Sequence, residues 1–158
     1  MFTKKKITKD ITPQLIKNKV KADSSLSIPI INYYNDYTVE SIVMVNRKTR
    51  MKEGLAQLFY KNGNIKQEGV WHNNKQEGVW KFYDVNGNIT AKVSFKNDYQ
   101  DGVSIFYNYK GKIIEKSDWE KGKLNGRVIE YYDNGKIKSD AKWLLGKKLN
   151  EKKFALNQ

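Results

Sequence analysis

A glycine recurs with a 24-residue period from Gly54 onward. Counting this glycine as position 0 of each copy, an aromatic residue stands at position 5, glycine at 9, isoleucine at 11 and an aromatic residue at 17. Five positions that keep one chemical type in four copies indicate an internal repeat, and periods of about 20–50 residues are typical of solenoids and repeat arrays. The glycines at position 0 are Gly54, Gly78, Gly102 and Gly126.

The residues around position 9 predict a tight turn in each copy. Three copies have Asn-Gly there and the third has Lys110-Gly111. Asn-Gly is typical of such turns because both residues tolerate positive φ. An aromatic-rich segment precedes the turn and an isoleucine begins the segment after it, so each copy predicts a β-hairpin. The three Asn-Gly pairs are Asn62-Gly63, Asn86-Gly87 and Asn134-Gly135.

The second strand of each hairpin alternates between apolar or small residues and polar ones. Since successive side chains of a strand point to opposite faces, positions 11, 13, 15 and 17 should share a buried face. We therefore expect the isoleucines at position 11 and the aromatic residues at position 17 to form two apolar ladders. They are Ile65, Ile89, Ile113 and Ile137, and Trp71, Phe95, Trp119 and Trp143.

A second turn connects each hairpin to the next one. The pairs there are Asn73-Asn74, Asn97-Asp98, Lys121-Gly122 and Leu145-Gly146, mostly residues that tolerate left-handed backbone. Consecutive strands joined by tight turns are antiparallel neighbours. The sequence thus predicts an all-β fold, an elongated single-layer antiparallel meander of four 24-residue β-hairpin repeats over residues 54–150. The glycine at position 0, where the chain enters a strand, predicts a bulge or a close backbone approach.

The chain before and after the repeats divides into three segments. Residues 1–29 are interpreted as a solvated basic tail and linker, with a short helix from about Pro13 to Lys21, which the apolar spacing fits, as the alternative. Residues 30–53 contain one expected strand, Val39 to Val45, which would cap the first edge of the sheet. Residues 151–158 are a C-terminal tail.

The formal net charge of +13 favours acidic partners, which include nucleic acid, an anionic membrane and an acidic protein surface. Solubility of a lysine-rich chain is the alternative explanation. Seven lysines lie between Met1 and Lys21, counting Lys21 itself. The densest positive charge outside this tail is a basic cluster formed by Arg47, Lys48, Arg50 and Lys52.

The residues that commonly carry catalysis are scarce. The chain has no cysteine and one histidine, His72, which excludes thiol chemistry and leaves no evident metal cluster or catalytic triad. We predict a protein that is not an enzyme and that uses no cofactor or metal. No apolar run approaches the ~20 residues of a membrane span, and no apolar stretch follows the charged start, so we expect a cytoplasmic protein.

The repeat resembles the MORN-type repeat, specifically the bacterial variant of the YwqK family of toxin–antitoxin antitoxins. The resemblance rests on the segment Gly78-Val-Trp-Lys-Phe-Tyr83 and on Asn-Gly-x-Ile followed by an aromatic residue and a short polar turn. It covers about residues 54–150. Position 2 departs from the pattern, because only the second copy has tryptophan there, Trp80. The resemblance implies a protein-binding or antitoxin-like role.

We therefore predict a protein-interaction module that binds and neutralises another protein, as an antitoxin or an inhibitor of an effector. A basic RNA- or DNA-associated protein is the first alternative, and a membrane-surface scaffold is the second and less favoured one. Candidate partner-binding residues are the basic cluster and two tyrosines outside the repeated core positions, Tyr99 and Tyr109.

Overall fold

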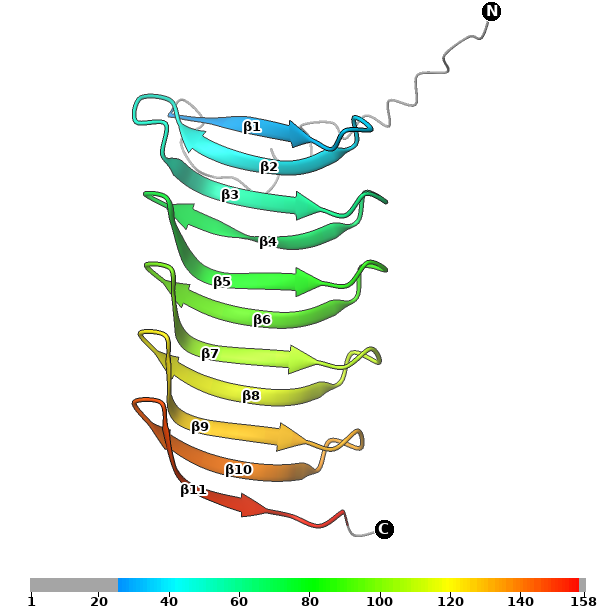
Figure 1. The fold of residues 1–158 in the computed structure, drawn as a ribbon, viewed down its shortest axis with the longest axis vertical. Coiled ribbons are helices and arrows are strands. Elements are labelled where there is room, and N and C mark those ends of the chain that lie inside the picture. Colours follow the sequence, from blue (N-terminus) through cyan, green and yellow to red (C-terminus); the bar gives the residue numbers. More distant parts are fainter. Residues whose placement is uncertain (1–25, 157–158) are drawn as a thin grey trace, which may run out of the picture.

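The structure is a computed structural model that describes residues 26–156. These residues form one open antiparallel sheet of eleven strands, in which spatial order equals chain order (Figure 1). The strands are β1 (Ser27–Tyr33), β2 (Val39–Asn46), β3 (Lys52–Phe59), β4 (Ile65–His72), β5 (Lys75–Tyr83), β6 (Ile89–Lys96), β7 (Tyr99–Tyr107), β8 (Ile113–Glu120), β9 (Lys123–Tyr131), β10 (Ile137–Leu144) and β11 (Lys147–Lys153).

The predicted single-layer hairpin meander is confirmed. The four repeats are the hairpins β3–β4, β5–β6, β7–β8 and β9–β10. Three further strands extend the sheet. The expected strand at Val39 is β2, but it is paired with β1, which begins at Ser27 inside the segment interpreted as a linker. At the other end β11 runs past residue 150 to Lys153. The solvated tail and its alternative, a helix from Pro13 to Lys21, lie outside the described residues.

The two kinds of turn use different backbone conformations. Between hairpins both central residues are left-handed, as predicted, for example Asn73 at φ 50° and Asn74 at φ 66°. In the turns within the repeat hairpins only the glycine of Asn-Gly takes positive φ. The expectation that both residues adopt positive φ is therefore wrong for the asparagine. Gly63 (φ 86°) follows a turn in which its N–H donates to the Tyr60 carbonyl at 2.9 Å. This is a type I turn closed by a left-handed residue, a common hairpin connection.

Each repeat contains two bulges. Phe59 lies opposite Ile65 and Leu58 opposite Gln67, so Lys66 at position 12 has no residue opposite it. The isoleucine at position 11 therefore pairs with the aromatic residue at position 5, and the prediction of one uninterrupted alternation from position 11 to 17 is wrong. The second bulge is at position 0, where all four glycines have positive φ, as expected. Bulges of this kind bend and twist strands.

The bent sheet has an inner, concave face that carries positions 2, 4, 13, 15 and 17. The most buried residues are at positions 2 and 15, in the bend: Ala56, Trp80, Ser104, Gly69, Val93, Ser117 and Ala141. The two predicted ladders are less buried than expected. The aromatic residues at position 17 and three of the isoleucines are half-buried, and Ile137 is 37% exposed.

The largest core residue is one that the ladders did not include. Trp80 is completely buried, and its ring lies edge-on to the rings of Trp71 and Phe95 at centroid distances of 5.4 and 6.5 Å. A Cβ atom added to Gly69 on β4 would lie 2.2 Å from Cδ2 of Trp80. The absence of a side chain at Gly69 is therefore what makes room for the indole of the neighbouring strand.

Bonds between successive hairpins repeat at both ends of the strands. In the turns between hairpins, the Asn74 N–H donates to the Lys52 carbonyl at 3.0 Å, and the Gly122 N–H to the Gln100 carbonyl at 2.9 Å. At the other ends of the strands, the Tyr60 hydroxyl donates to the Tyr83 carbonyl at 2.9 Å. The turns between hairpins are thus bonded to the first strand of the hairpin before them, and the Tyr60 hydroxyl bonds its hairpin to the next one.

Candidate partner-binding surfaces

The basic cluster lies in the turn between β2 and β3. Asn46 Oδ1 accepts a hydrogen bond from the Lys48 N–H at 2.9 Å, which holds the turn open to solvent. Arg47, Lys48 and Arg50 are exposed there. Lys52 differs from them, because its Nζ lies 4.2 Å from the centroid of the Trp71 ring. All four residues are exposed, and Lys52 also contacts an aromatic ring of the inner face.

The two candidate tyrosines lie near opposite ends of the strands. Tyr99 begins β7, at the end of the strands where the basic cluster and the turns between hairpins lie. Tyr109 lies in the turn between β7 and β8, with Lys110 Nζ 5.3 Å from its ring centroid. Both rings are well exposed. The structure therefore does not bring all the predicted residues into one site.

The outer face of the sheet carries an aliphatic stripe. It consists of Leu55, Val70, Val79, Ser94 and Val103. The three valines are 44%, 54% and 49% exposed, in chain order. Val70 and Val79 line one shallow hollow, Val79 lies opposite Ser94, and the Ser94 hydroxyl donates to the Val103 carbonyl at 2.7 Å. The aliphatic side chains are therefore contiguous from β3 to β5, and Ser94 on β6 separates them from Val103 on β7.

Lysines accompany the aliphatic stripe on the outer face. Lys81, Lys92 and Lys116 alternate with buried positions on their strands, and Lys81 and Lys92 lie directly opposite each other. Lys81 pairs with Glu68 at 3.2 Å. Lys92 and Lys116 form no ion pair with any residue in 26–156. The outer face thus combines exposed aliphatic area with the positive charges of Lys92 and Lys116 and the carboxylate of Asp118, which lies directly opposite Val103.

A buried carboxylate anchors this face. Glu68 accepts hydrogen bonds from Gln57 at 3.1 Å, Lys81 at 3.2 Å and the Tyr83 hydroxyl at 3.0 Å. Burial favours the neutral form of Glu68, but the three donors outweigh burial and hold its pKa below the usual range. Burial and the neighbouring Glu68 charge raise the pKa of Tyr83 to about 12.

The raised pKa of Tyr83 predicts a loss of stability at high pH. A group whose pKa is higher in the folded state stabilises the fold fully below its unfolded pKa, about 10 for tyrosine, and loses this effect as pH rises through the folded value. Between pH 10 and about 12, the melting temperature should fall more for wild type than for Tyr83→Phe. Thermal melts monitored by circular dichroism would measure this, and Tyr109→Phe, on an exposed turn, is the control. Parallel curves for wild type and Tyr83→Phe would contradict the prediction.

His72 lies at the end of β4, beside the turn that connects β4 to β5. Its Nδ1 lies 2.7 Å from Glu53 Oε1, and Glu53 Oε2 accepts a hydrogen bond from the Asn73 N–H at 2.8 Å. The Asn73 bond is the main cause that lowers the pKa of Glu53. Within residues 26–156, no group of three or more His, Asp or Glu side chains is placed to bind a metal ion. In the same part of the chain, no helix has the length and apolarity to cross a membrane.

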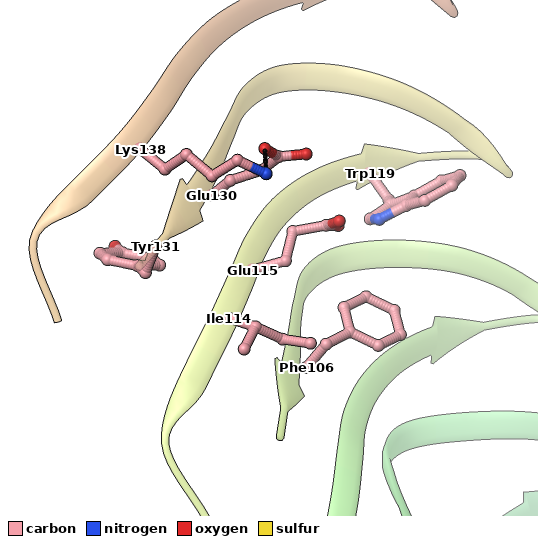
Figure 2. Close-up of a pocket in the computed structure, with 7 residues that line it drawn as sticks. All are labelled: Phe106, Ile114, Glu115, Trp119, Glu130, Tyr131 and Lys138. Carbon is pink, nitrogen blue, oxygen red and sulfur yellow. Dashed lines mark ion pairs between the residues drawn. The ribbon is translucent and has the colours of Figure 1, made fainter. Parts of the chain in front are cut away.

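The inner face opens into a hollow of about 500 Å³ between β7 and β10. Figure 2 shows Phe106, Glu115 and Trp119 inside the bend of their strands, with Lys138 paired to Glu130. The Trp119 Nε1–H donates to Ser117 Oγ at 3.0 Å, which fixes the indole orientation. Ile114 and Tyr131 complete the lining.

The sequence interpretation overlooked both the aliphatic stripe and this hollow. The signal for the stripe is position 1, which is aliphatic in the first three copies and Arg127 in the fourth. The signal for the hollow is position 13, where the third copy alone has a carboxylate, Glu115.

Comparison with known families agrees with the repeat boundaries. Residues 52–73, 76–97 and 124–143 match the family described as MORN repeat variant. Each match spans one hairpin of the sheet, β3–β4, β5–β6 and β9–β10. No curated protein matches the chain. MORN repeat proteins are typically non-catalytic repeat modules, and no enzyme family matches. Three of the four repeat hairpins are therefore similar in sequence to the MORN repeat variant, and β7–β8 adds a further hairpin of the same architecture.

Proposed function

We propose that the protein is a non-enzymatic interaction module that binds an acidic surface of another protein through the outer face of its sheet. The aliphatic stripe is the observation that carries the proposal. Exposed apolar area that is contiguous over several strands and bordered by polar residues is typical of protein-binding surfaces. MORN repeats are generally interaction modules, which supports the same class of function.

The charges on this face argue for an acidic partner. Lys92 and Lys116 border the aliphatic stripe without ion pairs among the described residues, and the whole chain carries a net charge of +13. Complementary charge accelerates association and selects among partners. Neutralisation of a toxin or an effector is the specific form of this role that we propose, because a rigid face spread over several repeats can cover a partner's working surface.

The aliphatic stripe should be required for partner binding. We expect the double variant Val79→Asp/Val103→Asp to lose a protein that wild type recovers from its native cells after nuclease treatment. Both valines are about half exposed, so the sheet should stay folded while the partner loses apolar contact and meets two new negative charges. Quantitative mass spectrometry of the recovered proteins measures the loss.

The matched control is Thr90→Asp/Asn134→Asp, which adds the same charge at exposed positions at the other ends of the strands. It should recover the partner as wild type does. Recovery by the valine variant at the wild-type level would refute binding through the aliphatic stripe. Recovery of nucleic acid alone would favour the RNA or DNA alternative, for which affinity should fall linearly with the logarithm of salt concentration.

The basic cluster should contribute to the rate of association. In Arg47→Glu/Lys48→Glu/Arg50→Glu, we expect slower association with the acidic partner and a small change in dissociation, because exposed charges mainly steer encounter. Lys52 is left unchanged, since its position over Trp71 would confuse binding with folding. Surface plasmon resonance at two salt concentrations separates the two rates. An unchanged association rate would mean that the cluster is only a solvated turn.

A further inference from the structure

The hollow on the inner face between β7 and β10 has the composition of a site for a cation. Its lining includes three aromatic rings, those of Phe106, Trp119 and Tyr131. It also includes the carboxylates of Glu115 and Glu130 and the ammonium of Lys138, so that its net charge at neutral pH is −1. A negative hollow on a strongly basic chain stands out from the rest of the surface.

The two carboxylates of the hollow differ in their ion pairing. Glu115 and Glu130 lie directly opposite each other on β8 and β9, an arrangement in which like charges destabilise a sheet. Lys138 Nζ lies 3.1 Å from Glu130 Oε2, and this contact holds the pKa of Glu130 below its usual range. Glu115 makes no hydrogen bond or ion pair with any residue in 26–156. The hollow therefore lacks one positive charge.

Comparison among the repeats shows that this hollow is a local departure from the repeat pattern. At position 13, Glu115 replaces Gln67, Ala91 and Ser139 of the other copies. At position 2, Ser104 is a small residue like Ala56 and Val128, and Trp80 of the second copy is the exception. The carboxylate at position 13 is thus the feature that distinguishes the third copy.

We propose that this hollow binds a lysine side chain from the N-terminal segment of the same chain. Aromatic faces and a carboxylate attract an alkylammonium group, and its alkyl stem suits the apolar walls. The segment from Met1 to Lys21 contains seven lysines, the densest supply in the molecule. The site is separate from the outer face on which the proposed function rests.

Chain length and tethering favour this occupant over an untethered lysine. The hollow lies six to nine strands from β1, or about 29–43 Å at ~4.8 Å per strand. The segment that precedes Leu26 can span about 80 Å when extended, so it reaches the hollow. One cation over aromatic rings contributes only about 0.5–2 kcal/mol, which is too weak to hold a separate molecule at ordinary concentrations. Tethering raises the effective concentration to about the millimolar range.

Zero-length carbodiimide coupling of the full-length protein tests the contact, because it joins a carboxylate to an amine only where they touch. Mass spectrometry should find Glu115 or Glu130 linked to a lysine in residues 4–21. In a mixture of ¹⁴N- and ¹⁵N-labelled protein, the linked peptides should come from one chain. The Glu115→Gln variant should lose most of the product, including that formed at Glu130.

Glu40 is the matched control, because it is an exposed carboxylate on β2, near the start of the described chain. Equal coupling at Glu40 would mean that the lysines react with any carboxylate and would overturn the proposal. Products of mixed isotope composition would overturn it in favour of a second copy as the source.

A second readout uses the indole N–H of Trp119 in the ¹H–¹⁵N spectrum. Replacement of the seven N-terminal lysines with glutamine in the full chain should shift the Trp119 peak and leave that of Trp71 unchanged. An unmoved Trp119 peak would also overturn the proposal.

Discussion

Replacement of Trp80 with alanine should lower the free energy of unfolding by about 3–5 kcal/mol, the usual range for deleting a buried large aromatic residue. The loss should lie at the upper end of that range. Trp80 is fully buried, contacts two other rings and donates its Nε1–H to the Val70 carbonyl at 3.2 Å. Urea unfolding followed by circular dichroism would measure the loss.

Trp119→Ala is the matched control for that experiment. Trp119 is half-buried at position 17 and lines the hollow, so its removal should cost about 3 kcal/mol or less. A loss for Trp119→Ala that equals or exceeds the loss for Trp80→Ala would show that the stability of the sheet resides at position 17, as the 24-residue spacing alone predicted.

Gly69→Ala should destabilise the fold by roughly 2–4 kcal/mol, although it adds only one methyl group. The new Cβ would lie 2.2 Å from Trp80 Cδ2, so the indole must leave the bend and lose part of its burial. The backbone of Gly69 is not left-handed, and alanine itself fits a strand there. The expected cost therefore comes from the contact with Trp80, and urea midpoints would measure it.

A double-mutant cycle separates this contact from other effects. In the Trp80→Ala background, Gly69→Ala should cost nothing or be slightly stabilising, because the ring that it displaces is absent. The coupling energy should therefore be at least about 2 kcal/mol, within the range seen for residues in direct contact. Additive losses would mean that Gly69 matters for the backbone and that Trp80 has room to move.

The turns explain why the fold was predictable from the sequence. The left-handed conformations at Asn73-Asn74 and at the glycines of position 9 can be predicted from the local residue types, which tolerate positive φ well. The 24-residue spacing of these turns then fixes the length and order of the strands. The alternation failed at position 12 because a bulge is a property of two paired strands. One strand read alone does not reveal that Lys66 has no residue opposite it.

The core and the candidate surfaces were less accessible to sequence analysis for a related reason. Trp80 is core because Gly69, on the preceding strand, is small, and this complementarity crosses from one hairpin to the next. A search for conserved chemical type at one repeat position discards such pairs, since neither residue recurs. The aliphatic stripe was missed for another reason: position 1 is aliphatic in three copies, but the contact of Val79 with Val70, at a different repeat position, forms only across paired strands.

The fastening of each hairpin to the next has a consequence for how such a chain changes over generations. The bonds from Asn74 to Lys52 and from Gly122 to Gln100 join the main chain of a connecting turn to the main chain at the start of the preceding hairpin, so they do not depend on particular side chains. An in-frame duplication of one repeat would recreate them and lengthen the sheet by two strands, about 10 Å. Length can thus change in one genetic event, whereas a feature such as the Trp80–Gly69 contact must arise by separate substitutions within a single copy.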